Sequence, residues 1–418
     1  MRPLDRLKVA PSSVEGRRRR HIGTHSCALG LALLLFWANI SAAQSSTGPR
    51  TTILVDRDML PAAGASATVT VGRIMAGIED RFVPLLLFED QGKLRRATNA
   101  VYRLAKLELF DDPQENWLRV ANHELFGHGG RLRELFDGPI HYALPAPPPY
   151  GRGGGATYFQ LDRIPTVEEI LSVTVGGMEA NRMAARILTQ DALTSGHWHY
   201  RDARRYWYAE YDTIHYIRHT HDLEKEGHDV SDFIKIYNEV ATNNDEKTLD
   251  ARTLRRYVLA GFANPMIAYA YYSAYISYVW SGHAESPVPM IPIGATRYLP
   301  MVRFQLTSFG TEWVIDNAFV RNGRFIDATI RAGQTIGART WGVGLQSTRV
   351  AVWKQWTFDG EGHLWRQPEW GGEAMGTARR RLRSGLSIVA QGGYKTNGFL
   401  AGERIHQGAI LRIGAALD

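Results

Sequence analysis

The segment Val120–Arg131, VANHELFGHGGR, combines two histidines and a glutamate that could hold and use a metal ion. Neutral imidazoles at His123 and His128 are typical zinc ligands, and one further ligand would leave a coordination position open for water. Glu124 directly follows the first histidine, so its carboxylate could lie beside the metal and take a proton from water. The segment therefore indicates a zinc-dependent hydrolytic site.

The two histidines are five residues apart, whereas the usual zinc-peptidase motif spaces them by four. A five-residue step rotates a regular helix by about 140°, which would point the imidazoles away from each other. One π-type turn absorbs the extra residue and restores a shared face. Because Gly127 lies inside the step and eases such a distortion, the spacing predicts a bulge at Leu125–Gly127.

A third ligand is expected from a later helix that packs closely on the first one. The stretch GGMEANRMAAR offers Glu179, and Asn181 suits a supporting role behind the ligands. The glycine pair Gly176-Gly177 is costly in mid-helix, which is explained if another helix approaches closely there. Glu168 and Glu169 are alternative third ligands, and Glu179 would otherwise be an ordinary solvated helix carboxylate.

The motif HELFGH resembles the HEXXGH motif of the dipeptidyl peptidase III family of zinc metallopeptidases, and EAN resembles the third-ligand helix of the broader gluzincin peptidases. The resemblance covers about residues 115–185. It implies a zincin-like fold, Zn2+ held by His123, His128 and Glu179, and Glu124 as the general base of peptide hydrolysis. The family's second motif begins with paired acidic residues, whereas this chain has glycine and methionine before Glu179, so dipeptide release is not implied.

A tyrosine-rich helix is expected from Tyr200 to His219, with most of its aromatic side chains in packing contacts. Within it, His215 or Tyr211 is predicted to stabilise the oxyanion of a tetrahedral intermediate. The glycine-rich stretch Gly151–Ala156 lacks the Lys-Ser/Thr ending of a phosphate loop and is interpreted as a flap over a peptide substrate.

Residues 1–43 have the pattern of a signal peptide: a basic stretch, an apolar stretch at Ala28–Trp37 and small residues at Ser41–Ala43. The single cysteine, Cys27, lies inside this segment, so any metal must be held by His, Asp and Glu. The segment also carries most of the formal net charge of +7, which removes the support for a nucleic-acid partner. We expect export to the periplasm or outer membrane of a Gram-negative-type cell.

The predicted fold class is α+β. Residues 44–285 are expected to form a mainly helical metallopeptidase-like domain, because apolar residues recur at helical spacing from Thr51 to about Val240. Helix starts are predicted at Asp112 and, through a capping box with Glu169, at Thr166. The uncharged segment Tyr257–Trp280 is interpreted as a buried helix pair broken at Asn264-Pro265, with a membrane-dipping hairpin as the alternative.

Residues 286–418 are expected to form an antiparallel β domain of seven or eight strands, long enough to close a small barrel. Turns are predicted at Asn322-Gly323 and Asp359-Gly360. In the last segment Leu411 and Ile413 alternate with Arg412, so the two sides of that strand differ in polarity. Both a soluble barrel and an outer-membrane barrel fit this pattern.

The sequence therefore predicts an exported zinc metallopeptidase that acts on a peptide or protein substrate. The alternative is a non-enzymatic envelope β-barrel protein with a structural or vestigial metal site. A zinc hydrolase of a non-peptide amide or ester is a third possibility. A hydrolase requires Glu124, whereas a structural metal site does not.

Overall fold

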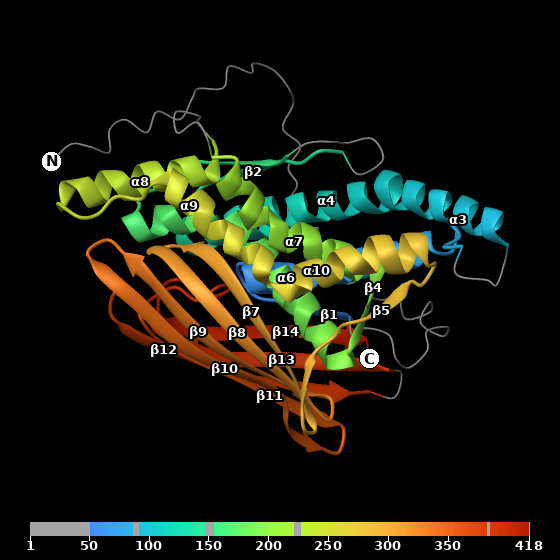
Figure 1. The fold of residues 1–418 in the computed structure, drawn as a ribbon. Coiled ribbons are helices and arrows are strands. Elements are labelled where there is room, and N and C mark those ends of the chain that lie inside the picture. Colours follow the sequence, from blue (N-terminus) through green and yellow to red (C-terminus); the bar gives the residue numbers. More distant parts are fainter. Residues whose placement is uncertain (1–50, 87–91, 147–153, 221–226, 383–384, 418) are drawn as a thin grey trace. The chain divides into compact units, whose positions relative to one another are not determined.

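The computed structural model describes residues 51–86, 92–146, 154–220, 227–382 and 385–417. Residues 49–418 form one compact unit of mixed α+β structure, in which helices precede a large antiparallel sheet (Figure 1). The predicted signal peptide and Gly151–Gly153 of the predicted flap lie outside the described residues.

The large sheet has ten antiparallel strands in the order β1-β14-β13-β12-β11-β10-β9-β8-β7-β6. The first strand, β1, pairs with the last, β14, in a register that places Thr51 opposite Leu417. Among the described strands, β1 and β6 each pair with one neighbour, so the sheet is open where barrel-like closure was predicted. The strands are β1 (Thr51–Val55), β6 (Ile291–Ile293), β7 (Thr296–Thr307), β8 (Gly310–Arg321), β9 (Arg324–Thr335), β10 (Ala338–Trp353), β11 (Trp356–Arg366), β12 (Trp370–Arg381), β13 (Leu386–Lys395) and β14 (Gly408–Leu417).

Eight long strands follow one another from β7 to β14, as the sequence predicted. The Asn322-Gly323 turn is confirmed between β8 and β9, with φ of 52° and 70°, the left-handed values that a tight hairpin needs. The turn predicted at Asp359-Gly360 is wrong, because β11 runs straight through these residues. The chain turns earlier, at Lys354, whose φ is 53°.

Five helical segments follow one another from residue 93 to residue 135: α3 (Lys93–Lys106), the π-helix η3 (Leu107–Asp111), α4 (Asp112–Ala121), the π-helix η4 (Asn122–His128) and α5 (Gly129–Leu135). The predicted helix start at Asp112 is wrong, because the preceding residue is itself helical. The Asp112 carboxylate binds Arg204 instead of capping a helix. Gly129 and Gly130 likewise continue the helix, since tertiary packing outweighs their low propensity.

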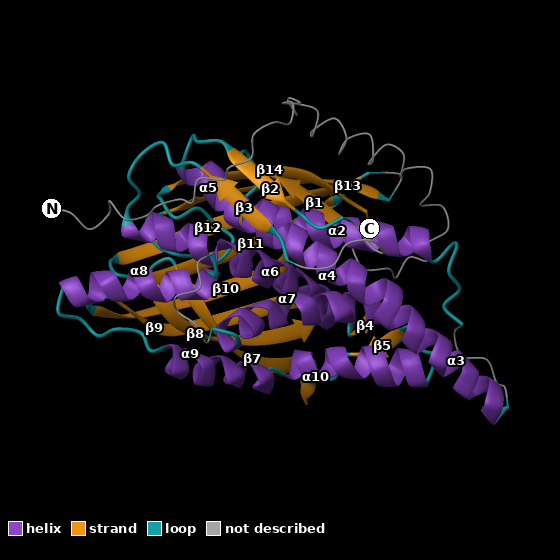
Figure 2. Ribbon diagram, turned by 90° about the horizontal axis from the view of Figure 1, so that it is seen from above, coloured by secondary structure: helices purple, strands orange, loops and turns teal. Residues whose placement is uncertain are grey.

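The remaining helices lie on one face of the sheet (Figures 1 and 2). At the β7-β8 edge a described helical residue, Tyr257, also packs on side chains of the opposite register, Phe304 and Trp313. The longest helix, α6, begins with the predicted capping box between Thr166 and Glu169. These helices are α2 (Pro61–Glu79), α6 (Val167–Ser195), α7 (Tyr200–Arg218), α8 (Asp229–Asn243), α9 (Ala251–Val258), the 3-10 helix η5 (Leu259–Ala263), α10 (Pro265–Tyr271) and the π-helix η6 (Tyr272–Trp280). Two small two-stranded sheets join β2 (Ile140–Ala143) to β3 (Ala156–Phe159) and β4 (His197–His199) to β5 (Glu285–Pro287).

The uncharged segment Tyr257–Trp280 is helical and breaks at Asn264-Pro265, as predicted. The Asn264 side chain caps α10 by accepting a hydrogen bond from the Met266 amide. Tyr278 is fully buried, whereas Trp280 is 63% exposed, so only part of this segment belongs to the core. In the described part of the chain, no helix combines the length and apolar character needed to cross a membrane.

Candidate metal centre

The two histidines of the opening motif lie on a π-helical stretch, which confirms the predicted widening of the helix. This stretch, η4, covers Asn122–His128 and includes the predicted bulge at Leu125–Gly127. The wider turn accommodates the extra residue between His123 and His128, so both imidazoles point to the same side. Their ring centroids are 4.8 Å apart.

Glycines allow η4 and α6 to meet backbone to backbone, as the sequence predicted for the pair in α6. A Cβ atom placed on Gly127 would lie 2.5 Å from the Gly177 Cα and 2.6 Å from the Gly176 carbonyl oxygen. A Cβ atom on Gly177 would lie 2.2 Å from Nε2 of His123. The glycines therefore set both the helix separation and the space available to the His123 ring.

Three side chains converge with metal-ligand chemistry: His123, His128 and Asp229, the first residue of α8. The Asp229 Oδ2 atom lies 3.0 Å from Nε2 of His123 and 3.5 Å from Nε2 of His128. Ligands bound tetrahedrally to one zinc ion at about 2.0–2.2 Å are about 3.4 Å from each other. The spacing of the three atoms therefore fits a single ion of zinc size.

Hydrogen bonds on the far side of each ring orient the imidazoles toward this point. The Nδ1 atom of His128 lies 2.6 Å from the Val173 carbonyl oxygen, which can only accept, so this nitrogen carries the hydrogen. The Nδ1 atom of His123 lies 3.1 Å from Oδ2 of Asp212 and donates to it in the same way. If both rings are neutral, the lone pair of each Nε2 atom faces the Asp229 carboxylate. These lone pairs and the carboxylate repel each other unless a cation lies between the two Nε2 atoms and the carboxylate.

The Asp212 carboxylate is itself fixed from three sides. Arg119 forms an ion pair with it, and Asn181 donates an Nδ2 hydrogen bond of 2.9 Å to its Oδ2 atom. Although burial opposes ionisation, Arg119 and His123 hold the pKa of Asp212 at about 2. Asn181, expected behind the ligands, thus acts through Asp212.

The electrostatics of the three converging groups favour positive charge. Burial alone would lower the pKa of His123, but Tyr216, Asp212 and Asp229 raise it well above 6.5. Burial also opposes the charge on His128, and Asp229 nevertheless raises the pKa of His128. The pKa of Asp229 is lowered, against the effect of burial, mainly by His128. The pocket is therefore built for a cation, supplied either as protons or as a metal ion.

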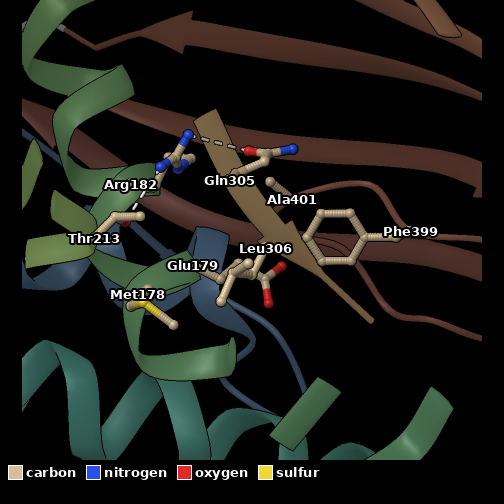
Figure 3. A pocket seen from close by; sticks show the side chains of 8 residues that line it. All are labelled: Met178, Glu179, Arg182, Thr213, Gln305, Leu306, Phe399 and Ala401. Carbon is tan, nitrogen blue, oxygen red and sulfur yellow. Dashed lines mark hydrogen bonds between the residues drawn. The ribbon is translucent and has the colours of Figure 1, made fainter. Parts of the chain in front are cut away.

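Glu179, the predicted third ligand, is not among the three converging groups. Its side chain accepts hydrogen bonds from Arg131 and, at 2.7 Å, from the Gly402 amide. It lines a small cavity, bordered by eight residues of α6, α7, β7 and the loop before β14 (Figure 3). The other candidate with a described partner, Glu169, binds Arg163 and the amide of Thr166. Asp229 therefore lies where Glu179 was expected. Glu179 is instead the buried ion-pair partner of Arg131.

Glu124, the predicted general base, lies under the small β2-β3 sheet. Its Oε2 atom accepts a 2.7 Å hydrogen bond from the Thr157 hydroxyl, and its side chain is 5% exposed. A Cβ atom on Gly155 would lie 2.5 Å from the Glu124 Cγ atom. The end of the glycine-rich stretch therefore covers Glu124 closely, where the sequence predicted a flap.

The two predicted oxyanion donors, Tyr211 and His215, lie on α7 with Asp212 and Tyr216. Tyr211 stacks on Trp207, and His215 is exposed and packs against His219. Among the described contacts, neither reaches the three converging groups. Tyr216 does: its ring stacks on His123 with centroids 5.0 Å apart.

Asp229, Asp212 and Tyr216 are the site residues that sequence reasoning missed. Asp229 ends the stretch GHD, and an acidic residue at the first position of a helix is itself a helix-start signal. Asp212 and Tyr216 are four residues apart on α7, the spacing that places two side chains on one helix face. No protein-family model, curated protein or solved structure matches this chain.

Proposed function

We propose that this chain is a metal-dependent hydrolase whose metal ion is bound by His123, His128 and Asp229. The observation that carries the proposal is the convergence of two Nε2 atoms on one Asp229 oxygen. Hydrogen bonds to Asp212 and Val173 place the ring hydrogens on the opposite nitrogens. Two nitrogen donors and one oxygen donor form a set that zinc accepts.

A zinc ion held there would polarise a substrate carbonyl and make water more acidic, which is the usual contribution of a hydrolytic metal. The set has three protein ligands, as catalytic zinc sites do, whereas structural sites usually have four. Support for peptide bonds as the substrate comes from the motif resemblance alone.

Glu124 is the residue that we assign to proton transfer. Its Oε1 atom would take a proton from the attacking water and return it to the leaving amine nitrogen, while a hydroxyl of the chain occupies Oε2. The Thr157 hydroxyl, 2.7 Å from this oxygen, orients the carboxylate. It also leaves the second oxygen of the carboxylate for water.

Tyr216 is better placed than Tyr211 or His215 to donate a hydrogen bond to a developing oxyanion. Its ring lies against His123. A positive charge on His123 would lower the pKa of the Tyr216 hydroxyl. Burial and Asp229 outweigh this effect and raise the pKa of Tyr216 to about 12. The hydroxyl therefore keeps its hydrogen at neutral pH and can donate it in a hydrogen bond.

Metal content of the purified full chain tests the ligand set. We expect about one zinc per chain, lost in His128→Ala and Asp229→Ala. Glu179→Gln is the discriminating control, because Glu179 lies outside the three converging groups; the variant is less stable, but its folded form should keep the metal. Loss of metal in Glu179→Gln but not in Asp229→Ala would refute the assignment.

Hydrolysis of a fluorogenic peptide library tests the role of Glu124. Glu124→Gln should retain the metal and lose at least 100-fold in activity, the usual contribution of a general base. Glu168→Gln, on the helix that follows the flap, is the matched control and should retain activity. If the wild-type chain binds metal but hydrolyses no peptide, amide or ester, the proposal is wrong and the metal site is structural.

A further inference from the structure

The face of the sheet turned away from the helices has a side-chain pattern opposite to that of a water-exposed sheet. In β9 the outward positions are Ile326, Ala328, Ile330 and Ala332, and the inward positions include Asp327 and Arg331. Ile330 is 52% exposed, whereas Asp327 and Arg331 are 6% and 4% exposed. Soluble sheets turn apolar residues toward the helices and polar residues toward water.

The inversion continues across the sheet in register. Inward positions carry charge, including Glu312, Asp316, His363, Glu373, Lys395 and Arg412, all of them buried. Outward positions carry large apolar side chains at 43–71% exposure: Ile315, Val343, Leu364, Ile388, Leu411 and Ile413. Between the strand ends, the described outward positions of β8 to β14 hold no charged residue, apart from the exposed Arg349 where the register of β10 shifts. Asn317 is polar there, but its side chain bonds to Tyr298 and to the Ala328 carbonyl oxygen.

Aromatic residues border this apolar face at both ends of the strands. Trp341 and Trp370 pack edge to face at one end, with centroids 5.0 Å apart. Trp353 and Trp356 face each other in register at the other end. Trp and Tyr concentrate at this position where a sheet passes through the two surfaces of a bilayer.

The height of the apolar face is close to that of the hydrocarbon layer. On β12 the uncharged outward positions run from Trp370 to Ala378, a length of about 27 Å at the usual rise per residue. At the strand tilt of about 40° that is common in membranes, this length spans about 21 Å, and the basic Arg380 follows beyond it. The apolar band of membrane-embedded sheets is about 25 Å tall.

Exposed positive charge is denser at one end of the strands, because the opposite end carries Arg339 and Arg366 alone among the described exposed Lys and Arg residues. Exposed basic residues lie in or beside the turns β8-β9, β10-β11 and β12-β13: Arg321, Arg324, Arg349, Lys354, Arg380 and Arg381. The Arg380 guanidinium lies over the Trp356 ring, and the Lys354 amine lies over the Trp353 ring. Such aromatic and basic pairs suit the anionic headgroup layer of a membrane.

We propose that the outward face of β8 to β14 contacts the hydrocarbon of a phospholipid bilayer, with the basic turns in an anionic headgroup layer. The helices and the candidate metal centre then lie on the other side of the sheet, away from this lipid. A second copy of the chain would equally cover apolar area. It does not account for aromatic residues at both strand ends and a basic border at one end.

Flotation of the full chain with phosphatidylethanolamine and phosphatidylglycerol vesicles tests the proposal. The wild-type chain should float with the vesicles. Ile330→Arg and Ile413→Arg should each lower the partition coefficient about ten-fold or more, because arginine is costly at the bilayer midplane. Ile164→Arg is the matched control, since Ile164 is 75% exposed but lies outside the sheet, and it should float like the wild type.

A second measurement guards against misfolded variants. Cys27 is the only cysteine, so Cys27→Ser gives a background for single-site labelling. A fluorophore on Ile330→Cys should be quenched by doxyl-labelled lipids, and one on Ile164→Cys should not. Equal quenching at both sites overturns the proposal. A detergent-free dimer that Ile330→Arg dissociates also overturns it, in favour of a second copy. Metal content is measured on the same samples, so failure of the proposed hydrolytic site is recorded separately.

Discussion

Replacement of Gly127 by alanine should disrupt the contact on which the candidate metal centre depends. The new Cβ atom would lie 2.5 Å from the Gly177 Cα atom, and an ordinary contact begins near 3.4 Å. The two helices must therefore separate by about 0.9 Å. Both neighbours are backbone atoms, so a change of rotamer cannot relieve the overlap.

The expected loss of stability follows from two opposing effects. Overpacking of this kind costs about 1–3 kcal/mol, and the cost should be near the upper limit because backbone must move. Alanine gains about 1 kcal/mol over glycine in helix propensity. We expect a net loss of about 2 kcal/mol in the free energy of unfolding. We also expect at least a ten-fold loss of zinc affinity, because the Val173 carbonyl that orients His128 lies on the displaced helix.

Gly77→Ala provides the matched control in α2. A Cβ atom there would meet nothing within 4 Å, so only the propensity gain of about 1 kcal/mol should appear. Thermal unfolding followed by circular dichroism, together with zinc titration against a chelator, measures both variants. If Gly127→Ala is as stable as Gly77→Ala and binds zinc as tightly, η4 and α6 are not in close backbone contact and the metal centre does not depend on it.

Three further variants probe other parts of the molecule. Asp212→Asn should lower zinc affinity about 10–100-fold, because it weakens the bond that orients His123; an unchanged affinity in chelator competition would count against this role. Glu179→Gln should destabilise the fold by about 3 kcal/mol in thermal melts, since Arg131 is fully buried and keeps its charge; a loss below 1 kcal/mol would be inconsistent with that ion pair. Glu373 is buried with no hydrogen-bond partner among the described residues, and burial and Glu361 raise its pKa to about 8. Because its pKa is raised on folding, Glu373 lowers the stability of the chain progressively as the pH rises from 4.5 toward 8. Glutamine carries no such charge, so Glu373→Gln should stabilise the chain by about 3 kcal/mol at pH 8 and hardly at pH 4.5. Equal melting-temperature shifts at both pH values would contradict this.

Local features of the candidate site were predictable because they depend on residues close in sequence. The π bulge follows from the five-residue spacing and Gly127, and the close helix contact follows from the glycine pair in α6. The choice between Glu179 and Asp229 depends on which helix end reaches the histidines. That is a tertiary question, because α8 begins about 100 residues after His128 and no local pattern fixes its position.

The fold shows the same division between local and distant effects. The β7 to β14 meander could be predicted because each strand pairs with its neighbour in sequence and Asn322-Gly323 marks one turn. β1 was missed, because five residues at the start of a helical region show no pattern of their own. Its assignment as a strand depends on a partner at the opposite end of the chain.

The pairing of Thr51 with Leu417 has a consequence for how the chain folds. Contacts between residues this far apart raise contact order and slow folding, because a long loop must close first. During synthesis β1 remains unpaired until residues 408–417 have left the ribosome, while the helices of the candidate metal centre can already pack. Deletion of residues 408–417 should therefore give a slowly aggregating chain with two unpaired strand edges, one at β13 and one formed by the orphaned β1.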